Sequence, residues 1–93
     1  MERRLLNQGE IAAALADLGG WKVDKNVLTK KYSFKNFAES LAFVNRIGEI
    51  AEAADHHPDI IFGWGYAEIS TTTHDRGGIT DVDFALAKKI DAL

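Results

Sequence analysis

The fold of this chain is decided by NFAESLAFVNRIGEIAEAADHHPDIIFGWGYAEISTTTH, residues 36–74, where a helical pattern gives way to an alternating one. Asn36, with a glutamate three positions later, has the spacing at which a side chain caps the start of a helix. Pro58, the only proline, disfavours helical geometry in the residue before it. We therefore predict a long helix that starts after Asn36 and ends at about Asp55 or His56.

This long helix carries two apolar stripes instead of one. The stripe expected to pack on a sheet consists of Phe37, Leu41, Val44, Ala51 and Ala54. The second stripe consists of Phe43, Ile47 and Ile50. One stripe is enough to pack a helix on a sheet, so the second is predicted to bury itself against another helix or another subunit. We therefore expect a homodimer or homotetramer.

After the proline, strand-forming residues surround a glycine-rich turn, which predicts a β-hairpin. A two-residue turn at Gly65-Tyr66 would set His57 opposite His74 on the returning strand. Directly opposed residues on neighbouring strands have β-carbons about 4.5–5.5 Å apart. The register thus predicts that the third histidine of the chain meets the pair at the helix exit.

The segments before the long helix add one helix and a second hairpin. Asn7 caps a short amphipathic helix that Gly19-Gly20 stops. Two strands follow, over residues 21–24 and 27–34, and they join at Lys25-Asn26.

The C-terminal segment is predicted to be a third helix, with Thr80 as its N-cap and Val82, Leu86 and Ile90 facing inward. The complete order is then α-β-β-α-β-β-α. This order predicts an α+β fold in which helices pack on one face of a four-stranded antiparallel sheet. The chain length of 93 residues fits a single domain over residues 1–93.

Composition excludes several classes of function. The chain has no cysteine, which removes disulfides and thiolate chemistry and fits a reducing compartment. A net charge of -3 and scattered lysine pairs argue against direct nucleic-acid binding. Neither a signal peptide nor a membrane-spanning apolar segment is visible, so we expect a cytoplasmic protein.

The three histidines are the residues that suggest chemistry. Histidine both gives and takes a proton near neutral pH, and carboxylates nearby would make an acid/base pocket. The candidates are Glu52, Asp55 and Asp83, and Glu52 lies one helical turn before His56, which it could orient. From the residues alone, the chemistry is proton transfer on a small molecule.

Each of these residues also has a purely structural interpretation. The helix dipole favours histidine at a helix C-terminus, where His56 and His57 lie. Asp83 follows Thr80 by three positions and would serve as a capping carboxylate, a role that is compatible with holding a histidine. Trp21 and Trp64 are of a residue type that is commonly found in cores.

The spacing of these residues resembles the signature of the pterin-4a-carbinolamine dehydratases. In order, it reads Glu52, three residues, His56-His57-Pro58, five residues, Trp64, nine residues, His74, eight residues and Asp83. The resemblance covers essentially the whole chain, including Gly20-Trp21 and the FKNFAESLAFVNRI helix. One departure is Trp64, at a position where the family often has tyrosine.

The resemblance implies dehydration of a 4a-hydroxytetrahydropterin to the quinonoid dihydropterin, the step that recycles the pterin after aromatic amino-acid hydroxylation. It implies His56, His57 and His74 as the acid/base set, with Asp83 holding or tuning a histidine. The residues expected at the pterin are Trp21, Glu52, Asp55 and Trp64. Proton transfer of this kind needs no cofactor and no metal.

Two other functions compete with this one. Three imidazoles form an accepted catalytic zinc set, although the adjacent histidines do not form the HExxH arrangement of zinc hydrolases. The resemblance also implies an alternative, non-catalytic binding role, because vertebrate members of the family bind a homeodomain transcription factor. Metal content and turnover separate these functions from the dehydratase.

Overall fold

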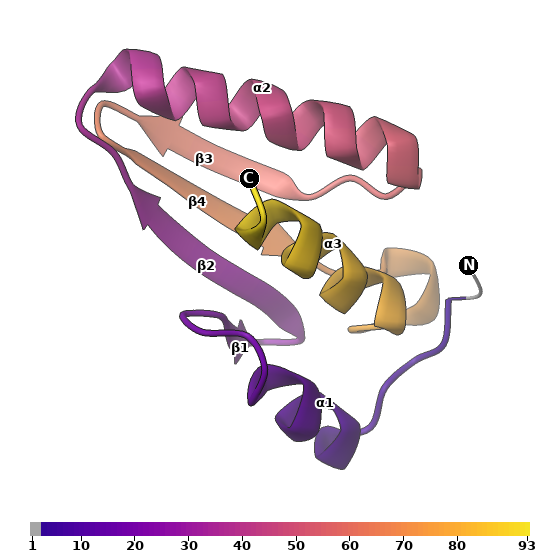
Figure 1. Cartoon of the computed structure of the whole chain (residues 1–93). Helices are drawn as coiled ribbons and strands as arrows, with labels where there is room; N and C mark the ends of the chain where they lie inside the picture. Colours follow the sequence, from indigo (N-terminus) through magenta and orange to yellow (C-terminus); the bar gives the residue numbers. More distant parts are fainter. Residues whose placement is uncertain (1–2) are drawn as a thin grey trace.

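A four-stranded antiparallel sheet with strand order β1-β2-β4-β3 carries the fold, and the helices lie over one of its faces (Figure 1). The computed structural model describes residues 3–93. Its elements follow the predicted order, with bounds α1 (Gln8–Leu15), β1 (Lys22–Asp24), β2 (Val27–Ser33), α2 (Phe37–Ala54), β3 (Asp59–Gly63), β4 (Tyr66–Thr71), the short 3₁₀ helix η1 (His74–Arg76) and α3 (Asp81–Asp91). The predicted α+β fold is confirmed.

Side chains at the helix starts explain why the helices begin where they do. Asn7 and Glu10 form a reciprocal capping box on α1, and Asn36 accepts a hydrogen bond from the Glu39 amide at the start of α2. The α1 and α2 caps were both predicted. Each satisfies backbone amides that a helix start would otherwise leave unpaired.

The first hairpin turns at Lys25-Asn26, as predicted. Both residues have positive φ, 51° and 64°, which is the backbone of a type I′ hairpin turn. In the second hairpin the turn lies at Trp64-Gly65, one residue earlier than predicted, and Gly63 pairs with Tyr66. Gly65 has a φ of 82°, a conformation that favours glycine.

This change of turn alters the strand register by two residues. Apolar residues keep their faces because side chains alternate with a period of two. However, β4 ends at Thr71, and His74 lies in η1 instead of opposite His57 on a strand. The predicted strand pairing of these two histidines is therefore wrong.

The predicted roles of the two α2 stripes are wrong in part: Ala51 is buried and Val44 packs against the core, as predicted, but the other large residues of that stripe do not. Ile47 is fully buried, while Phe37 and Leu41 are 45% and 40% exposed. The reason lies beside the helix, where the Phe43 ring packs on Tyr32 of β2 and on Phe34, the residue directly after that strand, with centroid distances of 4.7 Å and 4.9 Å. The stripe containing Phe43, Ile47 and Ile50 thus packs on the core of its own chain.

Asp91, at the end of α3, joins that helix to the sheet. Its carboxylate accepts hydrogen bonds from the Trp21 indole at 3.0 Å, the Lys30 ammonium at 3.0 Å and the Tyr32 hydroxyl. Burial raises the pKa of Asp91, but these three hydrogen bonds outweigh it and hold the pKa below its ordinary value. Burial, together with the bond to Asp91, raises the pKa of the Tyr32 hydroxyl.

We expect Asp91→Asn to lower the free energy of unfolding at pH 7 by about 1–2 kcal/mol. Because the folded-state pKa is depressed, the stabilisation is present above the ordinary pKa of 3.8 and is lost as the pH falls through the folded value. Urea unfolding at pH 7 and at pH 2.5 should show the difference from wild type shrink. Asp17→Asn, on an exposed residue, is the control, and an Asp91→Asn deficit that stays constant with pH would contradict the prediction.

Candidate active site

The end of α2 separates the two adjacent histidines. Asp55 adopts a left-handed conformation with a φ of 50°, and the His56 amide bonds back to the Ala51 carbonyl at 3.2 Å. Pro58 then prevents the helix from continuing. His56 is consequently buried, with 5% of its surface exposed, whereas the His57 side chain is 56% exposed.

Asp83, in the first turn of α3, holds His56. Its Oδ1 lies 2.6 Å from His56 Nε2 and also accepts the Thr71 hydroxyl at 2.6 Å. Its Oδ2 accepts the Thr73 hydroxyl and the Thr80 amide, both at 2.9 Å. Four donors therefore satisfy a fully buried carboxylate.

The same carboxylate is part of the capping box of α3, in which Thr80 is the N-cap. Asp83 thus combines the two roles that its sequence position allowed: it caps the helix and it contacts a histidine. Val82, Leu86 and Ile90 of this helix are buried, as predicted.

Glu52 orients His57 and not His56. The Glu52 carboxylate hydrogen-bonds His57 Nε2, because the left-handed Asp55 turns the next residue into the core and the one after it back over the last turn of α2. Nδ1 of His57 makes no hydrogen bond within residues 3–93, so it is available to a ligand.

A pocket of about 310 Å³ brings the three histidines together, as predicted, although by a different route from strand pairing. η1 and the loop before it place His74 across from the helix exit. The ring of His74 makes no hydrogen bond in the described part of the chain. The lining residues are Arg3, Asp55, His56, His57, Thr72, Thr73, His74 and Asp75.

The two tryptophans do not join this pocket. Trp21 is 6% exposed and donates its indole N–H to Asp91 in the core. Trp64 is 72% exposed in the β3–β4 turn, and at 3.3 Å per residue along β3 it lies about 20 Å from His57. Within one chain, only Asp55 and Glu52 of the expected pterin contacts lie beside the histidines.

Sequence reasoning missed Arg3. Its guanidinium Nη1 lies 2.8 Å from His56 Nδ1, and its Nη2 donates to the Asp55 carbonyl at 2.6 Å. No local pattern indicates this role, because more than 50 residues separate Arg3 from the histidines.

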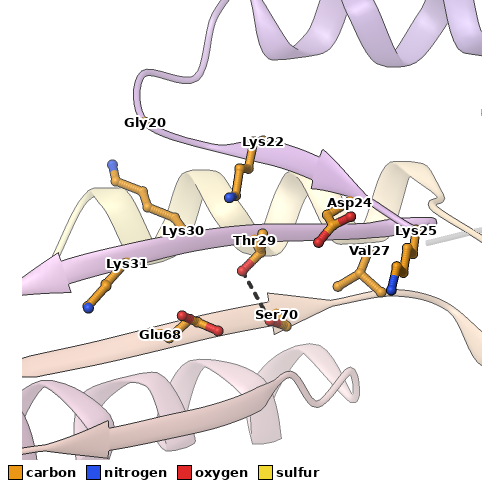
Figure 2. Close-up of a pocket in the computed structure, with 10 residues that line it drawn as sticks. All are labelled: Gly20, Lys22, Asp24, Lys25, Val27, Thr29, Lys30, Lys31, Glu68 and Ser70. Carbon is orange, nitrogen blue, oxygen red and sulfur yellow. Dashed lines mark hydrogen bonds between the residues drawn. The ribbon is translucent and has the colours of Figure 1, made fainter.

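A larger pocket, of about 570 Å³, lies on the face of the sheet away from the helices. Figure 2 shows side chains of β1, β2 and β4 around it, including Lys22, Lys31 and Glu68, with the Thr29 and Ser70 hydroxyls bonded at 3.1 Å. It contains no histidine. The smaller pocket is the better candidate because it holds the acid/base groups.

The histidine pocket is equipped for proton transfer. His57 and His74 line it, each with a ring nitrogen that makes no hydrogen bond within residues 3–93, and imidazoles can serve as general acid and general base. Among residues 3–93 no three His, Cys, Asp or Glu side chains are grouped so that they could hold a metal ion. In the same range no helix is long and apolar enough to cross a membrane.

Fold and site together define a small α+β protein with a pocket lined by three histidines at one end of its sheet. The chain belongs to the pterin 4 alpha carbinolamine dehydratase family, whose model matches residues 4–93.

Comparisons with individual proteins agree with this family. The chain is 51% identical over 88 residues to a Rubrobacter xylanophilus protein with the provisional name pterin-4-alpha-carbinolamine dehydratase, covering 92% of this chain and 82% of that protein. It resembles the crystal structure of a transcriptional coactivator/pterin dehydratase from Brucella melitensis, with a TM-score of 0.91 and 31% identity over 96% of this chain and 97% of that one. A pterin dehydratase-like RuBisCO assembly factor of the alpha-carboxysome matches with a TM-score of 0.63 and 26% identity, over 77% of this chain and 83% of that one.

Proposed function

We propose that this chain dehydrates 4a-hydroxytetrahydropterin to quinonoid dihydropterin and water. The observation that carries the proposal is one pocket with three histidines, in which Asp83 holds His56 and Glu52 holds His57. Membership of a family of pterin dehydratases supplies the substrate class.

The reaction needs one proton donor and one proton acceptor. The carbinolamine C–O bond breaks as the hydroxyl accepts a proton and leaves as water, while a ring nitrogen loses its proton and its electrons form the new double bond. His57 and His74 have ring nitrogens free for these transfers, and Asp55 lies beside them. In this proposal Asp83 positions a histidine and does not itself transfer a proton.

The product is the oxidised form of a pterin that a hydroxylase has used, so we place the reaction in tetrahydropterin recycling after aromatic amino-acid hydroxylation. The cytoplasm is the compartment we propose for this step. Neither proton transfer requires a cofactor.

The test is the rate of 4a-hydroxytetrahydropterin dehydration with and without the protein, since the spontaneous reaction supplies its own baseline. We expect added protein to accelerate the reaction in proportion to its concentration, and we expect prolonged chelation to leave the rate unchanged. A rate equal to the baseline would contradict the proposal. Loss on chelation with recovery on added zinc would instead support a zinc hydrolase-type site.

A second candidate is a binding role without catalysis. It is favoured by relatives whose names include a transcriptional coactivator and a RuBisCO assembly factor. In that case the histidine pocket would be inherited from catalytic relatives without being used, and the protein would not accelerate the dehydration. The same assay therefore separates the two candidates.

We also propose self-association, through a surface other than the Phe43, Ile47 and Ile50 stripe, which packs on the core of its own chain. β3 is an edge strand, and four large apolar side chains on β3, its turn and the start of α2 are exposed: Phe37, Leu41, Ile61 and Trp64. An exposed edge beside apolar side chains is a template for pairing with another chain.

We expect light scattering at micromolar concentration to give the mass of a dimer or tetramer. Ile61→Lys should lower that mass, because a charge would be placed on a side chain that is 62% exposed in the single chain. Leu5→Lys, on a side chain that is 52% exposed in another part of the molecule, is the matched control. A wild-type mass of one chain would contradict this prediction.

A further inference from the structure

Arg3 connects the walls of the histidine pocket. Its Nη1 lies on His56 Nδ1 at 2.8 Å and its Nη2 on the Asp55 carbonyl at 2.6 Å, both at the exit of α2. Its own carbonyl accepts a hydrogen bond from Arg76 Nε at 3.0 Å, in the η1 segment that begins with His74. One residue near the N-terminus thus contacts both segments that carry the pocket histidines.

These contacts determine where the proton of His56 resides. A guanidinium has donors and no acceptor, so Nδ1 of His56 accepts from Arg3 and carries no proton. The ring proton therefore lies on Nε2, which donates it to the Asp83 carboxylate. The other three donors to that carboxylate are Thr71, Thr73 and the Thr80 amide. His56 is therefore the neutral Nε2–H tautomer.

We infer that Arg3 is a positioning residue that locks His56 in this tautomer and leaves proton transfer to His57 and His74. With both ring nitrogens occupied, His56 has neither a lone pair nor a proton to offer to a bound pterin. Arg3 also fixes the distance between the helix exit and η1, and hence the spacing of the two reacting histidines. The catalytic part of this inference rests on the proposed function.

Nitrogen-15 NMR of the His56 ring at pH 6 tests whether Arg3 fixes this tautomer. The measurement does not depend on turnover. In wild type, Nδ1 should give the signal of an unprotonated nitrogen and Nε2 that of a protonated one. In Arg3→Ala, Nδ1 loses the donor that specifies this tautomer, so the two ring signals should no longer match those of wild type. Arg3→Lys restores a donor at this place and should return the signal toward that of wild type.

Turnover supplies the second readout. We expect Arg3→Ala to lower kcat by about tenfold or more with KM changed less than twofold, because misplaced reacting groups cost rate more than binding. Arg3→Lys should recover part of kcat. Arg4→Ala removes the neighbouring arginine, whose guanidinium pairs with Glu10 at 2.6 Å, and it should behave as wild type.

The two readouts distinguish the failure of this inference from that of the proposed function. The inference that Arg3 fixes the His56 tautomer would be wrong if Nδ1 were protonated in wild type. It would also be wrong if Arg3→Ala kept the wild-type ring signals, whatever its activity. If wild type does not dehydrate the carbinolamine but its ring signals show an unprotonated Nδ1 and a protonated Nε2, the proposed function fails and the positioning of His56 by Arg3 stands.

Discussion

Replacing His57 with alanine is expected to slow 4a-hydroxytetrahydropterin dehydration by about 10²–10⁴-fold, which is roughly 3–5 kcal/mol of activation free energy. The imidazole is exposed in the pocket, with one nitrogen on Glu52 and the other free. Alanine removes the group that gives or takes the proton and leaves Asp83 and His56 untouched. A stopped assay at substrate saturation measures the loss.

Two comparisons show whether the loss of rate in His57→Ala is caused by the loss of proton transfer. Glu52→Gln keeps a partner on the His57 ring, so it should cost less rate than His57→Ala. The unfolding midpoint of His57→Ala should match that of wild type, because the replaced side chain is 56% exposed. Wild-type turnover in His57→Ala would remove His57 from the mechanism.

The largest effect on stability is expected from Asp83→Ala, at about 3–5 kcal/mol. The change removes a fully buried carboxylate that accepts from His56, Thr71, Thr73 and the Thr80 amide, and these buried donors would then be left unpaired. It also removes half of the capping box of α3. Against a typical total of about 5–15 kcal/mol, much of the stability would be lost.

Urea unfolding followed by circular dichroism measures this effect. Asp81→Ala is the matched control, since Asp81 lies two positions earlier on the same helix and is only partly buried, and it should cost less than about 1 kcal/mol. Equal unfolding midpoints for the Asp81 and Asp83 variants would show that the buried network contributes little.

The features of the fold that depend on neighbouring residues were predictable from the sequence. The caps at Asn7, Asn36 and Thr80 and the turn at Lys25-Asn26 each depend on groups within three residues. The turn at Gly65 was misplaced by one residue because a glycine fits either position and both registers keep the same apolar faces.

Features that depend on other elements were not predictable in the same way. Which stripe of α2 faces the sheet is decided by Tyr32 on β2 and Phe34 directly after it, which the helical pattern does not contain. Likewise, the contact of Asp83 with a histidine was implied by the family resemblance, and Arg3 has no local signal at all. The partner of Glu52 followed from the left-handed Asp55, which periodicity does not indicate.

In the proposed function, His57 and His74 transfer the protons of one dehydration. This claim is tested most directly by the rates of the His57→Ala, His74→Ala and double variants, each divided by the uncatalysed rate, between pH 6 and 8. We expect each single variant to lose about 10²–10⁴-fold, and the double variant to lose less than the product of the two, because the groups act in one reaction. Single variants that turn over at the wild-type rate throughout this range would contradict the claim and leave the histidines with a structural role.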